Sequence, residues 1–144
     1  MLTNLLLGLP VVALCLLLQS LMIIYAMRYY VSRKSMVENT SLWSSLFVVN
    51  GVMFLLLIGN LGQIAAWAFL FNWLEEFEEF GTAFYHSAVN FGSLGYGDIV
   101  MSEEHRLLGA IEAINGVLMI GVSTAALMTT FQHALRKPLE NLDG

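Results

Sequence analysis

Residues 80–97 read FGTAFYHSAVNFGSLGYG, and this uncharged stretch decides the fold of the chain. It can enter a membrane, yet it is too short and too rich in glycine to cross one. At most residues 84–94 are expected to be helical, and about 11 helical residues reach only about halfway through a bilayer core about 30 Å thick. The pattern is typical of a re-entrant segment, whose irregular backbone must lie against protein or a water-filled path.

The composition around this stretch indicates a membrane protein. Of the 144 residues, 58% are hydrophobic and 12% are charged, whereas soluble domains carry roughly 25% charged residues. The mean hydropathy is +0.72. We therefore expect an all-α membrane protein, with no room for a second folded domain. The single cysteine, Cys15, is expected to be a packed or lipid-facing small hydrophobe.

Three longer apolar runs are predicted to cross the membrane, since one crossing needs about 20 apolar residues. The first, residues 5–27, is followed by a polar linker, residues 28–41. The second comprises residues 44–73. The third comprises residues 106–135 and precedes Pro138, which is expected to stop the helix.

The charged residues predict an orientation. Five basic residues follow the first or the third crossing: Arg28, Arg33, Lys34, Arg136 and Lys137. Three crossings put both regions on one face, so the positive-inside rule predicts an outside N-terminus and a cytoplasmic C-terminus in a plasma or bacterial inner membrane. The re-entrant segment then enters from outside, among seven acids: Glu75, Glu76, Glu78, Glu79, Asp98, Glu103 and Glu104. These acids are expected to concentrate cations, although residues 75–79 fit a merely solvated loop equally well.

Residues 83–98 resemble the pore helix and filter signature of potassium channels. That family carries TVGYG where this chain reads SLGYG, followed by Asp98. The resemblance implies a homotetramer in which backbone carbonyls of four chains replace the water shell of K⁺. The implied filter consists of Ser93, Leu94, Gly95, Tyr96 and Gly97, with K⁺ bound at the first four. Gly95 and Gly97 suit this role because glycine readily adopts positive φ angles.

The inner end of the filter departs from the family pattern. Ser93 replaces threonine and loses a methyl group, while Gly92 stands where the family often has another threonine. Leu94 in place of valine keeps an apolar wedge. Two alternatives therefore stay open beside a potassium-selective channel. One is a channel of the same architecture that passes Na⁺ and K⁺ alike, and the other is a non-conducting membrane subunit that assembles or regulates another protein.

The resemblance also implies how the chain is divided. Residues 1–41 form an additional transmembrane helix with a cytoplasmic linker, and residues 138–144 form a short cytoplasmic tail. The pore domain between them, residues 42–137, has three parts: an outer helix at 44–73, the pore helix and filter at 82–98, and an inner helix at 106–135.

Two polar side chains are expected to support the filter. His86 is predicted to bond Tyr96 or Asp98 of its own or a neighbouring subunit, or to be an interfacial histidine that contacts lipid headgroups. Glu112 is the lone carboxylate inside a crossing, where such groups are costly and usually functional. It is predicted to lie behind the filter, bonded to Ser87 or Asn90 or held protonated, or else to reach water at the outer interface.

The inner helix contains the expected gating elements. Gly116 falls at the family's hinge position, with close helix packing as the alternative. Helical spacing places Val117 on one stripe with Ile120, Thr124, Met128 and Gln132. The resemblance puts this stripe on the ion path below the filter, with the last two residues as the inner constriction. Asn115 is expected to line the cavity or to join helices.

Other functions find no support in the sequence. It contains no nucleophile–base–acid set, no metal-ligand cluster and no arginine ladder of a voltage sensor, so we expect neither an enzyme nor a voltage-gated channel. The expected partners are the lipid bilayer, K⁺ as the permeating ion, and further copies of the chain. No cofactor, nucleic acid or soluble regulatory domain is expected.

Overall fold

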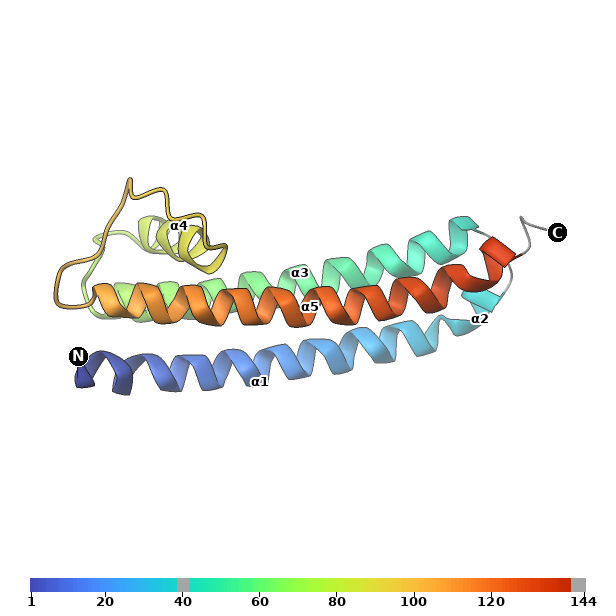
Figure 1. Cartoon of the computed structure of the whole chain (residues 1–144), viewed down its shortest axis with the longest axis horizontal. Helices are drawn as coiled ribbons and strands as arrows, with labels where there is room; N and C mark the ends of the chain where they lie inside the picture. Colours follow the sequence, from blue (N-terminus) through green and yellow to red (C-terminus); the bar gives the residue numbers. More distant parts are fainter. Residues whose placement is uncertain (39–41, 141–144) are drawn as a thin grey trace.

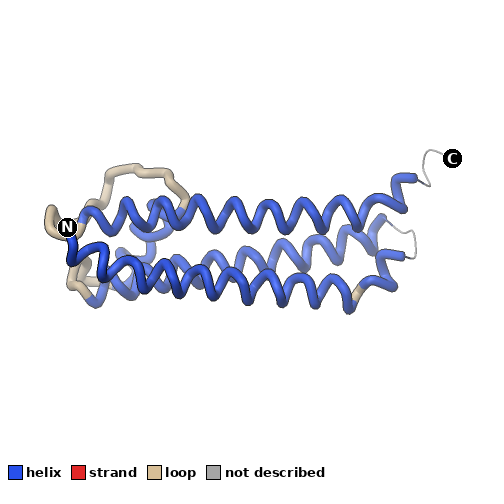
Figure 2. The backbone as a smooth tube through the Cα atoms, turned by 60° about the horizontal axis from the view of Figure 1, so that its bottom comes forward, coloured by secondary structure: helices blue, strands red, loops and turns tan. Residues whose placement is uncertain are grey.

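A computed structural model describes residues 1–38 and 42–140, and this part of the chain is helical, without strands (Figures 1 and 2). Three long helices lie side by side: α1 (Leu2–Ser32), α3 (Leu42–Trp73) and α5 (Arg106–Glu140). Two shorter helices accompany them: α2 (Lys34–Glu38) and α4 (Phe80–Phe91). The all-α fold predicted from the sequence is confirmed.

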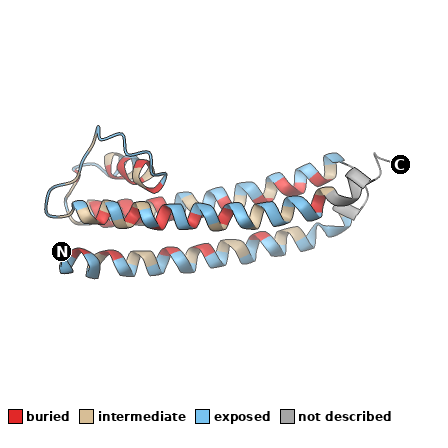
Figure 3. Cartoon of the chain, viewed as in Figure 1, coloured by how far each residue is buried: buried red, intermediate tan, exposed pale blue. Residues whose placement is uncertain are grey.

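The three long helices are long and apolar enough to cross a membrane. In the described part of the chain these spans are Leu2–Ser32, Leu42–Trp73 and Arg106–Leu135. Successive long helices run in opposite directions, so the N-terminus and the loop before α5 lie at the same end (Figure 1). Large apolar side chains are exposed along the helices, most of all along α1 (Figure 3). Lipid tails can cover such surfaces.

Some predicted helix boundaries are wrong. The helix of the first crossing extends beyond residue 27, because α1 continues to Ser32, and α2 follows inside the predicted linker. Helix α4 begins and ends earlier than the predicted segment 84–94. Helix α5 continues past Pro138 to Glu140, so Pro138 lies in the last turn of the helix instead of ending it.

The main core lies where α4 packs beside the long helices. Trp67 and Phe71 of α3 are fully buried there with ring centroids 5.8 Å apart, and Phe91 of α4 joins the same cluster. Cys15 of α1 is also 0% exposed in this core. It is therefore a packed residue and does not face lipid.

A buried polar network joins α1 to the other two long helices. Gln19 Nε2 donates to Ser123 Oγ of α5 at 2.8 Å, and Gln63 Nε2 of α3 donates to Gln19 Oε1 at 2.7 Å. All three side chains are buried. At the end of the bundle that holds the N-terminus, Asn4 Nδ2 donates to the Glu104 carbonyl at 2.7 Å. Helix α1 is thus bonded to α3 and α5 deep in the bundle and to the loop before α5 at one end.

Candidate ion-conduction site

Two glycines of α5 allow α4 to lie directly against it. A Cβ at Gly109 would be 3.0 Å from Asn90 Nδ2, and a Cβ at Gly116 would be 2.8 Å from the Phe91 Cα. Carbon atoms normally make contact at about 3.5–4.0 Å, so no side chain fits at Gly116. Gly116 therefore has a packing role at the end of α4, and its use as a hinge stays a prediction.

The filter segment, residues 92–98, follows α4. Along residues 93–97, positions with and without a positive φ angle alternate. Ser93, Gly95 and Gly97 have positive φ angles of 56°, 58° and 72°, whereas Leu94 and Tyr96 between them do not. Alternation of left- and right-handed residues turns successive carbonyls toward one side of the chain. The positive φ predicted for both glycines is confirmed. Sequence reasoning missed Ser93, because serine gives no signal for this conformation.

The filter segment lies on the surface of the single chain. Residues 92–98 are all exposed, including the side chains of Leu94 (57%) and Tyr96 (65%). Large apolar and aromatic side chains next to an irregular backbone need a protein environment at membrane depth. The segment is therefore structurally incomplete in one chain.

Tyr85 holds the C-terminal end of the filter segment. Its hydroxyl donates to Asp98 Oδ2 at 2.7 Å. This bond favours the ionised carboxylate and the protonated phenol, so it lowers the pKa of Asp98 and raises the pKa of Tyr85. Both side chains are exposed, so Asp98 carries a negative charge at the end of the segment.

His86 holds the chain at Ile99, one residue beyond Asp98. Its Nδ1 lies 3.0 Å from the Ile99 carbonyl oxygen, and its Nε2 lies 2.8 Å from Asn90 Nδ2. A carbonyl only accepts and an amide nitrogen only donates, so Nδ1 carries the proton and the ring is neutral. Burial lowers the pKa of His86, which agrees with the neutral form.

The predicted bond from His86 to Tyr96 or Asp98 is wrong within one chain. His86 lies on the buried face of α4, where its ring centroid is 4.9 Å from that of Phe77. Its neighbour Tyr85 lies on the exposed face and reaches Asp98 instead. The interfacial alternative for His86 is also excluded by its burial. An interaction with a neighbouring subunit stays a prediction.

An acidic side chain fastens the loop before α5 to the loop after α3. Glu76 accepts hydrogen bonds from the Ser102 amide at 2.8 Å, from Ser102 Oγ at 2.6 Å and from His105 Nδ1 at 2.5 Å. Burial alone would raise the pKa of Glu76, but these bonds outweigh burial and lower it. The sequence did not distinguish Glu76 from its acidic neighbours, because its partners lie 26 and 29 residues away.

Glu112 lies behind the filter segment. It is 0% exposed, and its Oε1 is hydrogen-bonded to Ser87 Oγ of α4. The predicted bond to the pore helix is confirmed through Ser87, and the alternative of a water-facing carboxylate is wrong. A half-crossing, its exposed filter segment and the helix behind it are thus brought together at one end of the bundle.

Comparison with known proteins agrees with this arrangement. A family model described as "Ion channel" matches residues 55–133, more than half of the chain. The chain belongs to this ion channel family. Neither a search of curated proteins nor one of solved structures finds a match. The matched region of the channel contains α4 and the filter segment, whereas α1 lies outside it.

Much of the surface of α5 is uncovered in the single chain, including Ile114 and Leu118. Every residue of the predicted path-lining stripe is exposed in the single chain: Val117, Ile120, Thr124, Met128 and Gln132. Asn115 is only 2% exposed, so within one chain it lies in the helix packing and not on this stripe.

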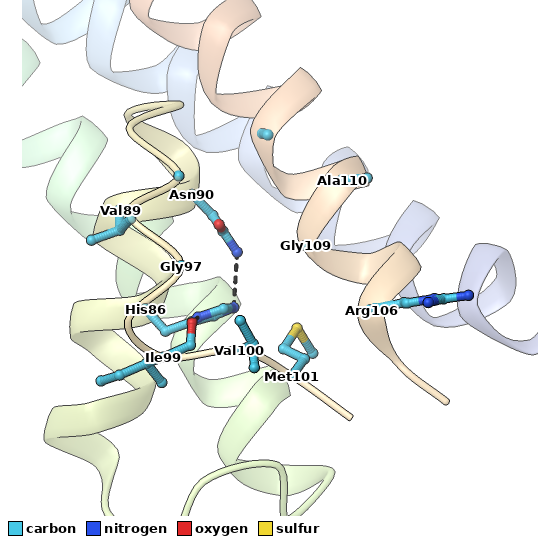
Figure 4. A pocket seen from close by; sticks show the side chains of 12 residues that line it. His86, Val89, Asn90, Gly97, Ile99, Val100, Met101, Arg106, Gly109 and Ala110 are labelled. Carbon is cyan, nitrogen blue, oxygen red and sulfur yellow. Dashed lines mark hydrogen bonds between the residues drawn. The ribbon is translucent and has the colours of Figure 1, made fainter. Parts of the chain in front are cut away.

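A cavity of about 440 Å³ lies between α4, the filter segment and the start of α5. Its polar lining includes His86 and Asn90, whose hydrogen bond is drawn in Figure 4. Arg106 also borders the cavity, but its side chain points away from the other labelled residues in that view. His86 and Ile99, which both line the cavity, are hydrogen-bonded to each other. This bond joins the chain that follows the filter segment to α4.

Proposed function

We propose that this chain is one subunit of a homotetrameric, potassium-selective channel that passes K⁺ passively across the membrane. The observation that carries the proposal is the alternation of positive φ angles at Ser93, Gly95 and Gly97, directly after a half-crossing helix. A potassium filter needs a column of inward carbonyls that replace the ion's water shell. The proposed ligands are the carbonyls of Ser93, Leu94, Gly95 and Tyr96, with Gly97 completing the filter.

Four copies are proposed because one strand of carbonyls can cover only one side of an ion. The exposed side chains of Leu94 and Tyr96 support this, since neighbouring copies can supply the protein environment that one chain lacks. Asp98 of each copy then contributes to a ring of negative charge at the outer mouth. Such a ring raises the local concentration of cations in a salt-dependent way.

The path below the filter is proposed to run along the predicted path-lining stripe of α5. Ile120 and Thr124 would line a cavity, while Met128 and Gln132 would form the inner constriction. The exposed positions of these residues support the proposal. The filter end is proposed to face outward and the far end of α5 the cytoplasm, in a plasma or bacterial inner membrane, as the basic residues indicate.

The test is K⁺ flux and reversal potentials in liposomes that contain the purified full-length protein. We expect K⁺ flux blocked by Ba²⁺, which is similar in size to K⁺, and reversal potentials near the K⁺ value in K⁺/Na⁺ bi-ionic solutions. Gly95→Ala is expected to lower the flux because a Cβ at a φ of 58° strains the backbone of the filter. Gly62→Ala on α3 is the matched control, since its Cβ would meet no atom within 4 Å.

Each alternative predicts a different result. Equal permeability to Na⁺ and K⁺ would identify a weakly selective channel of the same architecture, which the serine at position 93 favours. Absence of Ba²⁺-sensitive flux would indicate a non-conducting subunit. Crosslinking in detergent that stops at dimers would contradict the tetramer.

A further inference from the structure

The structure places Glu112 at a junction of three helices. On α5 it lies between Gly109 and Gly116, the two glycines against which α4 packs. Positions 109, 112 and 116 share one face of a helix. The carboxyl group of Glu112 is therefore directed at α4, and Ser87 meets it there.

The hydroxyl of Ser87 has two oxygen partners. It lies 2.8 Å from the Ile64 carbonyl of α3, and it is also hydrogen-bonded to Glu112 Oε1. A serine hydroxyl has only one proton to donate, and a carbonyl has none. Two hydrogen bonds among these three oxygens therefore require a second proton, and only the Glu112 carboxyl can supply it.

The surroundings of Glu112 agree with a neutral acid. In the part of the chain that the structure describes, no ion pair compensates a charge on this fully buried side chain. The titratable neighbour from α1 is the Cys15 thiol, which is no cation, and His86 of α4 is neutral and bonded elsewhere. Glu112 Oε2 is buried without a hydrogen-bond partner. That is far less costly for the carbonyl oxygen of a neutral acid than for a charged carboxylate.

We propose that Glu112 is a protonated positioning residue that donates to Ser87, which in turn donates to the Ile64 carbonyl. This chain of hydrogen bonds joins the inner, pore and outer helices behind the filter. Losing the proton would leave one hydrogen for two bonds: Ser87 would donate to the charged Glu112, and the bond from α4 to the Ile64 carbonyl of α3 would be lost. The effect on the filter rests on the proposed channel function, whereas the protonation of Glu112 does not.

Infrared spectroscopy of the full-length protein in liposomes tests the proton directly. The wild-type minus Glu112→Gln difference spectrum at neutral pH should contain the carbonyl stretch of a protonated carboxylic acid. Glu76→Gln, which changes a carboxyl whose hydrogen bonds lower its pKa, should remove only ionised carboxylate bands. Loss of ionised carboxylate bands in the Glu112→Gln spectrum would overturn the proposal.

Two further variants test the positioning role. Glutamine keeps an N–H donor, so Glu112→Gln should retain oligomer stability and K⁺ flux, whereas Glu112→Leu should lose both. Identical behaviour of the two variants would refute the donor role. If Glu112→Gln does not assemble, Ser87→Ala replaces it: the protonated-acid band should persist and move to higher frequency, and a band that is absent or does not move contradicts the bond to Ser87.

Discussion

Replacing Gly116 with alanine adds a single methyl group at the closest approach between α5 and α4. That methyl carbon would lie 2.7 Å from the Phe91 carbonyl carbon and 2.8 Å from its Cα. Both atoms are backbone, so they cannot rotate away as a side chain could. The helices must separate by several tenths of an ångström or more, and the filter begins at the end of α4 that is displaced.

Two opposing effects determine how Gly116→Ala changes the free energy of unfolding. Alanine favours a helix by roughly 1 kcal/mol over glycine, while overpacking a tight contact costs typically 1–3 kcal/mol. Because the obstructing atoms are backbone, we expect the upper part of that range. A net loss of about 1–2 kcal/mol per chain corresponds to a factor of about 5–30 in the folded-to-unfolded ratio.

The assay is the temperature at which the reconstituted oligomer dissociates, measured together with K⁺ flux. Gly121→Ala is the matched control on the same helix, since its Cβ would meet no atom within 4 Å. It should keep or raise the stability, whereas Gly116→Ala should lower both stability and flux. A Gly116→Ala protein as stable as the control, with altered open probability alone, would refute the packing role and favour a hinge.

Three other changes test separate contacts. Ser93→Thr restores the threonine of the potassium-channel family but places a β-branched residue at a φ of 56°, where it is an outlier, so it should lower the temperature at which the reconstituted oligomer dissociates. Glu76 has a lowered pKa, so its carboxylate contributes stability above its ordinary pKa and loses it as the pH falls through the lowered value; Glu76→Gln should flatten this acid branch in thermal melts. Gln19→Leu should destabilise the oligomer by about 0.6 kcal/mol or more, unlike Ser20→Ala, whose hydroxyl bonds only its own helix.

The sequence predicted the features that depend on local chemistry. Three crossings and a half-crossing follow from where charge is absent, and the positive φ of Gly95 and Gly97 follows from the lack of a side chain. The contact between Glu112 and α4 was also predictable, because a buried carboxylate in a crossing needs a polar partner.

Other features depend on rotations and distances that one sequence does not contain. Tyr85 and His86 are adjacent on α4, so a helical turn of about 100° separates their side chains, and only the docking of α4 decides which of them reaches Asp98. The positive φ of Ser93 has no signal in the sequence, because non-glycine residues rarely adopt it. The partners of Glu76 are Ser102 and His105, in the loop between the filter segment and α5. No periodic pattern in the sequence marks them.

The hydrogen bonds of Gln19 make α1 inseparable from the rest of the bundle. A pore cut free of α1 would turn Gln63 and Ser123 toward hydrocarbon, where Gln63 would lose its Gln19 partner and Ser123 would keep only Asn60 of α3. Such a fragment would expose these two polar side chains to lipid, and they would tend to form hydrogen bonds with polar groups of unrelated helices. By covering the side chains of Gln63 and Ser123, α1 limits the neighbours with which the pore can associate in the plane of the membrane.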